Sequence, residues 1–203
     1  MSRHLIAVSR AYVALGLLVA AMGCASGSKA AFVPPSRSAD FSLAGIPWGI
    51  AADSVTALIE PRGYNYNKAD NDGDLWYDGV LYRTPTRVFA FMAQKKLVKF
   101  RVVINTPDEN AITMYQKARA ELVSMYGQPK ETIEEYEAPY AKGDNKQLKA
   151  FRDKKAVMRT YWLPSGSRTS QVSIEVANNL AVLVDYESPA WNKESVRRRQ
   201  SGQ

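Results

Sequence analysis

Few side chains in this sequence could carry out chemistry. The 203-residue chain has one His and one Cys, and these are His4 and Cys24, both near the start. Nucleophilic triads need an imidazole base, and zinc sites gather several His and Cys ligands. Two carboxylates suffice for glycoside hydrolysis, so a carboxylate-only hydrolase stays as an alternative. The sequence favours a protein that is not an enzyme.

Acidic side chains gather in two polar segments, one with Glu134, Glu135 and Glu137 and one with Asp70, Asp72 and Asp74. The second segment has oxygens at the first, third and fifth positions of a calcium loop. An EF-hand loop then needs Gly at position 6 and Glu at position 12, where this chain has Leu75 and Leu81. A turn between strands explains the segment more simply. We predict no metal, and the glycine patterns of nucleotide sites are absent, so no cofactor is expected.

The first 23 residues have the pattern of an export signal. Arg3, His4 and Arg10 form a basic start, and an uncharged, mostly apolar run covers Ala11 to Met22. A helix that spans a bilayer needs about 20 apolar residues. This run is shorter than that, so a cleaved signal peptide is the better interpretation.

Ala21-Met22-Gly23-Cys24 resembles a bacterial lipobox. The resemblance implies cleavage before Cys24, lipidation of its thiol and a stable membrane anchor, because each buried CH₂ contributes about 0.8 kcal/mol. Ala25 at the next position favours the outer membrane. The expected location is therefore the periplasmic face of the outer membrane. The alternative is cleavage at another bond, which would release a soluble periplasmic protein.

The positive charge lies outside the expected domain. The net charge is +7, but residues 40–192 contain 19 basic and 19 acidic residues. The excess falls in the signal peptide (1–23), in a flexible tether (24–39) and in a basic tail (193–203) that we expect to be disordered. Since a nucleic-acid-binding domain would carry the charge on its folded part, no nucleic-acid partner is predicted.

Residues 40–192 are expected to form one α+β domain. Apolar spacing predicts a short helix around Val55 and Ile59 and a long one over 107–126, with Thr106 as its cap. Alternation predicts strands over 88–92, 98–104, 172–176 and 182–186. Asp78-Gly79 suggests a hairpin turn, and 137–155 reads as a loop or a short helix.

Short links between the predicted strands favour an antiparallel sheet with the two main helices on one face. The order helix, strands, helix, strands is also compatible with a degenerate repeat.

Aromatic residues are the remaining functional signal. A candidate recognition surface consists of Trp76, Tyr77, Tyr82, Tyr136 and Tyr140. Tyr and Trp are enriched at protein interfaces. The alternative is that these rings pack in the core and at the sheet edges.

The segment Gly45-Ile46-Pro47-Trp48-Gly49, the helix with Val55 and Leu58, and Tyr126-Gly127-Gln128-Pro129 resemble a pattern of small exported proteobacterial proteins. The layout of lipobox, tether and small domain is similar to the outer-membrane assembly lipoproteins of the SmpA/OmlA kind. The resemblance implies a non-catalytic lipoprotein that presents its domain to an envelope protein partner. The alternative is a periplasmic module that binds a lipid, a glycan or a small molecule.

Overall fold

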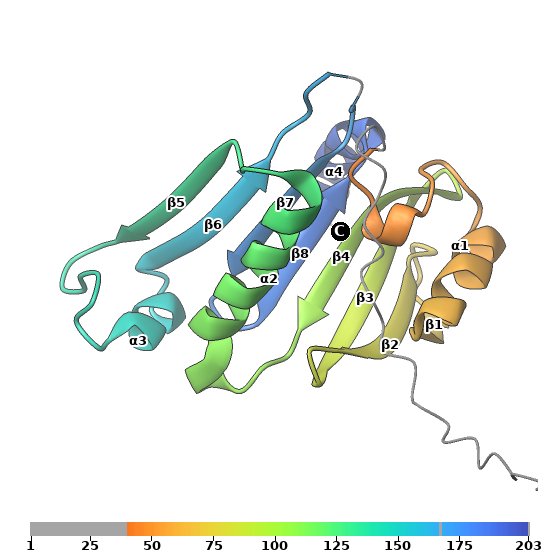
Figure 1. Ribbon diagram of the computed structural model, residues 1–203. Helices are drawn as coiled ribbons and strands as arrows, with labels where there is room; N and C mark the ends of the chain where they lie inside the picture. The colour runs from red at the N-terminus through yellow and green to blue at the C-terminus, as the bar shows by residue number, and fades with distance from the viewer. Residues whose placement is uncertain (1–39, 167, 203) are drawn as a thin grey trace, which may run out of the picture.

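The computed structural model describes residues 40–166 and 168–202. The predicted signal peptide, Cys24 and the tether lie outside these residues. The described chain forms one antiparallel sheet with the strand order β1-β2-β3-β4-β8-β7-β6-β5 (Figure 1). The strands are β1 (Asn65–Ala69), β2 (Leu75–Leu81), β3 (Thr84–Ala93), β4 (Lys96–Ile104), β5 (Glu131–Tyr136), β6 (Ala156–Trp162), β7 (Gln171–Val176) and β8 (Val182–Glu187).

The chain runs through the same order of elements twice. Helix α1 (Ala52–Ile59) precedes the meander β1 to β4, and α2 (Ala111–Tyr126) precedes the meander β5 to β8. The two meanders join where β4 pairs with β8. The predicted α+β class and antiparallel sheet are confirmed, and the topology has the helix-then-strands order of the predicted repeat.

The two main helices share one face of the sheet. Tyr77 on β2 bonds to Thr56 of α1 at 2.8 Å, and Thr160 on β6 bonds to Tyr115 of α2 at 2.7 Å. Tyr77 and Thr160 belong to one cross-strand row, which runs through Val88, Val102, Val184 and Ile174. This face and the two helices therefore enclose the core.

Helix α2 buries an apolar stripe of Ala111, Tyr115, Ala118 and Leu122. The stripe ends on Tyr126, and the neighbouring Met125 is only partly buried. A 3-10 turn, Asp108–Asn110, precedes the helix, and no side chain caps its first turn. The predicted Thr106 cap was wrong because the regular helix begins only at Ala111.

The predicted hairpin turn at Asp78-Gly79 was wrong. Strand β2 continues through both residues, and the chain turns at Tyr82 and Arg83, which have φ of 55° and 65°. Gly79 instead allows the Tyr64 ring to pack closely against β2. A Cβ at this position would lie 2.5 Å from the Tyr64 ring, so the close approach of the ring requires glycine.

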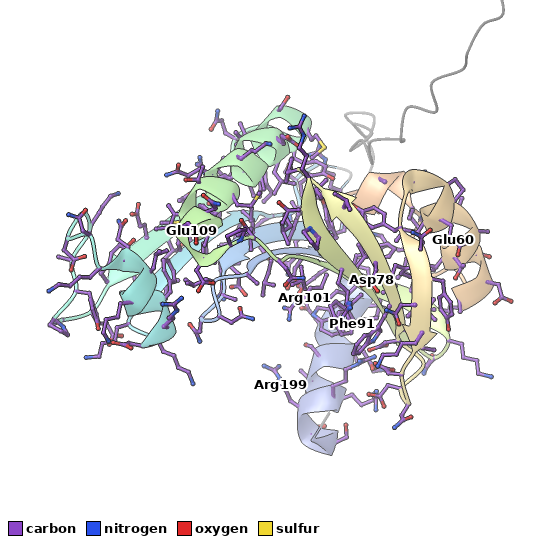
Figure 2. All side chains as sticks on the ribbon, turned by 90° about the horizontal axis from the view of Figure 1, so that it is seen from below. Glu60, Asp78, Phe91, Arg101, Glu109 and Arg199 are labelled. Atoms are coloured by element: carbon purple, nitrogen blue, oxygen red, sulfur yellow. The ribbon has the colours of Figure 1, made fainter. Side chains whose placement is uncertain are left out.

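The expected disordered tail is also wrong, because residues 189–201 form helix α4. Pro189 stands in its first turn, Arg198 and Arg199 in its last turn, and Gly202 ends it with φ of 74°. These are favoured helix start and stop residues. Figure 2 shows α4, marked by Arg199, on the opposite side of the sheet from α2, marked by Glu109. The remaining helix, α3 (Gln147–Arg152), lies within the polar segment 137–155, as one of the two predictions had it.

Candidate functional site

Most side chains on the sheet face opposite α1 and α2 are partly exposed, while Lys99 and Asp185 at its centre are buried. We call this sheet face the open face. Its central row pairs Trp76 with Phe89, Phe89 with Arg101, and Arg101 with Asp185 across four neighbouring strands. The row continues to Ser173 and Tyr161. Side chains of successive strand residues point to opposite faces, so each of these residues alternates with a core residue.

Aromatic rings occupy the β2–β3 end of this row. Trp76 and Phe89 meet edge to face with their centroids 4.9 Å apart. The Lys68 ammonium lies 4.0 Å from the centroid of the Trp76 ring, a cation–π contact. The Trp76 indole N–H donates to Asp70 at 3.3 Å. These contacts hold the two rings in one orientation on a half-exposed surface.

Ion pairs occupy the middle of the open face, where β4 meets β8. Arg101 donates to both oxygens of Asp185 at 2.8 and 2.7 Å, and Lys99 donates to Asp185 at 2.8 Å. Burial opposes ionisation of Asp185, but its hydrogen bond from Arg101 and the charges of Lys99 and Arg101 lower its pKa overall. Asp185 is therefore a fixed anion between two cations.

Further ion pairs flank this centre. Arg87 donates to Asp78 at 2.7 Å on the β2–β3 side, and Arg159 pairs with Glu175 on the β6–β7 side. The Arg87 and Arg159 side chains are each 40% exposed. The open face thus presents oriented charges and aromatic rings together.

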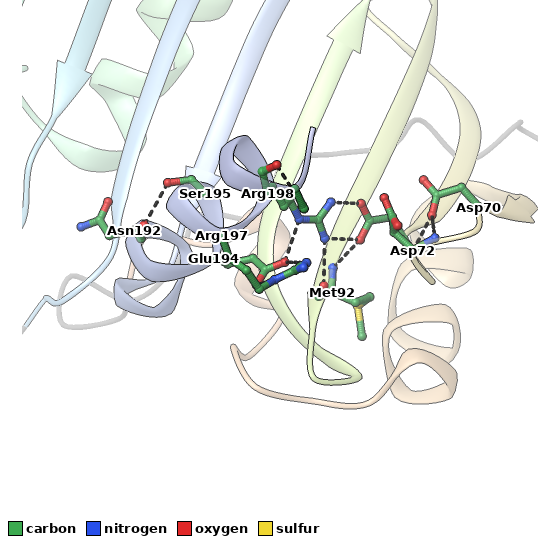
Figure 3. A network of polar contacts seen from close by, with 10 residues as sticks. Asp70, Asp72, Met92, Asn192, Glu194, Ser195, Arg197 and Arg198 are labelled. Carbon is green, nitrogen blue, oxygen red and sulfur yellow. Dashed lines mark hydrogen bonds and ion pairs between the residues drawn. The ribbon is translucent and has the colours of Figure 1, made fainter. Parts of the chain in front are cut away.

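Helix α4 packs on the open face through a buried polar network. The Arg198 guanidinium donates to both Asp74 oxygens at 2.5 and 2.9 Å and to Glu194 at 2.8 Å (Figure 3). It also donates to the Met92 carbonyl at 2.9 Å, while the Met92 N–H donates to Asp74 at 2.7 Å. The side chains of Asp74 and Arg198 are 3% and 10% exposed. The network therefore ties the helix to β3 and to the start of β2.

Aromatic contacts complete this attachment. Trp191 at the start of α4 lies 5.3 Å from Phe91 between ring centroids. The Lys99 ammonium lies 4.7 Å from the Trp191 ring. Helix α4 thereby covers Phe91 and Lys99 and leaves the central row from Trp76 to Tyr161 half-exposed.

A pocket of about 1130 Å³ opens at the end of the sheet. It lies where the β3–β4 turn, the β1–β2 turn and the starts of α1 and α4 come together. Its walls include Trp48, Leu97 and Ser188. The central row of the open face does not contribute to it.

The five aromatic residues of the predicted recognition surface do not form one surface. Trp76 lies on the open face, whereas Tyr77 is fully buried on the core face. Tyr82 stands in the β2–β3 turn and donates to Glu121 of α2 at 2.7 Å. Strand alternation separates Trp76 from Tyr77, since neighbours on a strand point to opposite faces.

The other two aromatic residues lie near α3. Tyr136 packs edge to face against Phe151, with ring centroids 6.4 Å apart. Tyr140 is 9% exposed and donates its hydroxyl to Asp153. Of the five, only Trp76 therefore belongs to the half-exposed row.

Several residues of the acidic clusters make structural contacts. Asp70 accepts from the N–H groups of Asp72 and Asp74 at 3.0 Å, as the predicted turn requires. Glu134 pairs with Lys142 at 2.5 Å. Within residues 40–166 and 168–202, no group of three His, Cys, Asp or Glu side chains could hold a metal ion.

Buried tyrosines offer no catalytic base at neutral pH. Burial raises the pKa of Tyr64 to about 12. Burial likewise raises the pKa of Tyr126 to about 12. Both hydroxyls therefore remain protonated at neutral pH.

Local sequence patterns do not reveal the ion pairs that join distant segments of the chain. Arg198 and Asp74 stand 124 residues apart, and Arg101 and Asp185 stand 84 apart. The alternation of charged with apolar residues on β4, β7 and β8 is the sequence pattern that could have indicated the open face. No local pattern indicated the pocket, whose walls come from several separate segments.

Comparisons with family models, with curated proteins and with solved structures give no match to this chain. None of the described helices is long and apolar enough to span a bilayer. The fold and the open face therefore define an α+β protein with a half-exposed aromatic and charged sheet surface.

Proposed function

We propose that the protein is a non-catalytic lipoprotein of the cell envelope. In this proposal, lipidated Cys24 anchors it to the periplasmic face of the outer membrane, and the open face binds an envelope protein. The proposal is supported by the export signal and lipobox in the sequence. The observation that carries it is the row from Trp76 to Tyr161 across the open face.

A protein partner suits this row because its side chains are already ordered. The ring of Trp76 is held by Lys68 and Phe89, and the guanidinium of Arg101 by Asp185. Ordering rotamer-rich side chains on binding costs about 0.5–1.5 kcal/mol each. A surface whose aromatic and Arg side chains are held in advance avoids part of that cost. Aromatic and Arg side chains also dominate binding energy at protein interfaces.

The paired charges give the surface its selectivity. Opposite charges meet at the β4–β8 junction, and half-exposed Arg87 and Arg159 flank it on either side. A partner must match this alternation, because a like charge opposite an ionised group is unfavourable. The alternation favours a protein surface with its own pattern of charges over a uniformly charged polymer.

Photo-crosslinking in intact cells tests this function. A benzophenone amino acid replaces Phe89 or Tyr161 on the open face, and Gln116 on α2 serves as the matched control. We expect one discrete protein adduct from both open-face positions and none from Gln116. Adducts that arise equally from Gln116, or no adduct from either open-face position, would overturn the proposal.

A charge reversal sharpens the same experiment. Arg159→Glu removes the cation that faces Glu175 on the open face, and the adduct from Phe89 should fall strongly. Arg152→Glu on α3 is the control, since its side chain is 54% exposed and pairs with Asp108. An equal effect of both reversals would argue for a general charge effect rather than a specific surface.

A ligand-binding module is the second candidate function. The observation that favours it is the pocket of about 1130 Å³ at the end of the sheet. Pockets for small molecules commonly have volumes of about 300–1,000 Å³. The two candidates use different parts of the molecule, so variants of the open face leave the pocket intact.

A further inference from the structure

The pocket at the end of the sheet has an apolar floor. Leu75, Met92 and Leu97 line it, and they are 5%, 5% and 0% exposed. Small apolar residues from the starts of α1 and α4 border it as well, namely Ala51, Ala52, Pro189 and Ala190. The small bordering residues are exposed or partly exposed, so they suit an alkyl chain, because burial of apolar surface favours binding.

Two polar atoms at the pocket have no partner in the described part of the chain. They are the Ser188 hydroxyl oxygen and the Trp48 indole nitrogen, and both atoms are buried. Ser188 as a whole is 6% exposed, and both residues line the pocket. Buried donors are nearly always hydrogen-bonded in native proteins. A ligand with acceptor oxygens would satisfy both of them.

Two helix starts border the same pocket. Helix α1 has eight residues and follows Ala51, and α4 has 13 residues and follows Ser188. Neither first turn receives a side-chain cap. The free N–H groups of a helix start carry partial positive charge and favour anions. The start of α1 therefore adds donors to the two unpartnered groups, whereas α4 adds fewer, since Pro189 has no N–H and the Trp191 N–H already donates to the Ser188 carbonyl.

The charged side chains around the pocket carry one excess positive charge. Lys95, Lys96 and Lys193 line it as cations, and Asp53 and Asp72 as anions. Glu194 and Arg197 also line it, but they neutralise each other as an ion pair at 2.6 Å. A single excess positive charge matches a monoanion better than a polyanion.

We infer that this pocket binds a monoanionic amphiphile of the fatty-acid class. The head-group oxygens accept from Trp48, from Ser188 and from the start of α1, and the alkyl chain covers the small apolar residues above the floor. This inference gives a ligand class to the second candidate function. It does not depend on the open face, so failure of one proposal leaves the other intact.

Isothermal titration with sodium dodecanoate tests the inference directly. The full chain carrying Cys24→Ser is used, so that no detergent competes with the ligand. We expect saturable binding of one dodecanoate. Dodecanol supplies the chain without the charge, and acetate supplies the head group without the chain, so each should bind at least about tenfold more weakly. Dodecyl phosphate, which approaches two negative charges at neutral pH, should also bind more weakly.

Two conservative variants locate the binding. Trp48→Phe keeps an aromatic ring but removes the N–H, and Ser188→Ala removes the hydroxyl. Each should weaken dodecanoate binding about ten- to a hundredfold, the usual effect of losing one hydrogen bond to a charged group. Trp76→Phe and Ser173→Ala on the open face are the matched controls and should bind as the parent does. Dodecanoate should also change the tryptophan fluorescence of the parent, and Trp48→Phe should abolish that change.

Several outcomes would overturn the inference. The first is the absence of heat of binding in a folded sample at millimolar dodecanoate. The second is binding that Trp48→Phe and Ser188→Ala leave unchanged, since the ligand would then lie elsewhere. Equal affinity for dodecanol and dodecanoate would contradict the anionic head group.

Discussion

Arg198 on the last helix donates to both carboxylate oxygens of Asp74, 124 residues earlier in the chain. Both side chains are almost fully buried. The cation also bonds to Glu194 and to the Met92 carbonyl. A helix whose buried residues are Glu194 and Arg198 is thus held by charge pairing, with Trp191 as its aromatic contact.

Removing this cation should destabilise the protein. Arg198→Met leaves Asp74 and Glu194 buried without their shared partner. Loss of one member of a buried ion pair costs about 3–5 kcal/mol, and undocking of α4 would reduce that cost by exposing the anions to water. We expect a loss of about 2–4 kcal/mol in urea unfolding and faster tryptic cleavage within α4.

Arg199→Met provides the control for that variant. Arg199 is exposed on the same helix, and substitutions at such positions change stability by about 0.5 kcal/mol or less. Equal stability of the two variants would show that the Asp74–Arg198 contact does not hold the helix.

Stability should fall in acid partly because of Asp185. Its pKa is lowered in the folded state below the ordinary value of 3.8, since Arg101 and Lys99 outweigh the effect of burial. A lowered pKa means that the folded protein binds the proton more weakly than the unfolded chain. The stabilisation is therefore complete above pH 3.8 and is lost as the pH falls below it toward the folded pKa.

The measurement for this prediction is urea unfolding at pH 6 and at about pH 3. Asp185→Asn should lose less stability over this interval than the parent does, although it is less stable at pH 6. Arg101→Met should also reduce the difference, because the cation is one cause of the lowered pKa. The same pH dependence in all three proteins would refute the assignment.

Gly79→Ala should destabilise the packing between β2 and Tyr64. The added Cβ would lie 2.5 Å from the Tyr64 ring and 2.9 Å from the Gly63 carbonyl oxygen. Overpacking of this kind costs about 1–3 kcal/mol. Val80→Ala is the control, because Val80 is 57% exposed and should have little effect. Thermal unfolding followed by circular dichroism measures the stability of both variants. If Gly79→Ala were as stable as the parent, the Tyr64 ring would have to move aside freely.

The proposed anchor is tested by Cys24→Ser. Acyl chains on Cys24 should add mass to the native protein and make it partition into the detergent phase of Triton X-114, and the serine variant should remain in the aqueous phase. Intact mass spectrometry measures the modification itself. An unmodified and water-soluble native protein would instead support a diffusible periplasmic protein.

The sequence predicted the elements whose residues alternate or repeat regularly. Val98, Phe100 and Val102 revealed β4, and Ala111, Tyr115 and Ala118 revealed α2. Edge strand β1 was not predicted, because all of its residues are exposed and no apolar alternation marks it. The same absence of an apolar face made residues 193–203 resemble a disordered tail.

The functional surfaces were harder to predict for a related physical reason. Asp78-Gly79 is a favoured turn pair, but the contact with Tyr64 decides its structure. Whether Trp76 or Tyr77 faces water depends on the register of β2. The hairpin turn wrongly predicted at Asp78-Gly79 left that register undetermined. Pockets and ion pairs that join distant segments can be identified only once the fold is known.

The junction of the two meanders has a consequence for how the protein is made. Strand β4 ends the first meander with the apolar residues Phe100, Val102 and Ile104, and its partner β8 is the last strand of the chain. A nascent first half therefore carries an uncovered apolar edge, which is a hazard for aggregation. Its edge is closed only after synthesis has passed Glu187, so a chaperone that holds the chain unfolded until then should raise the yield.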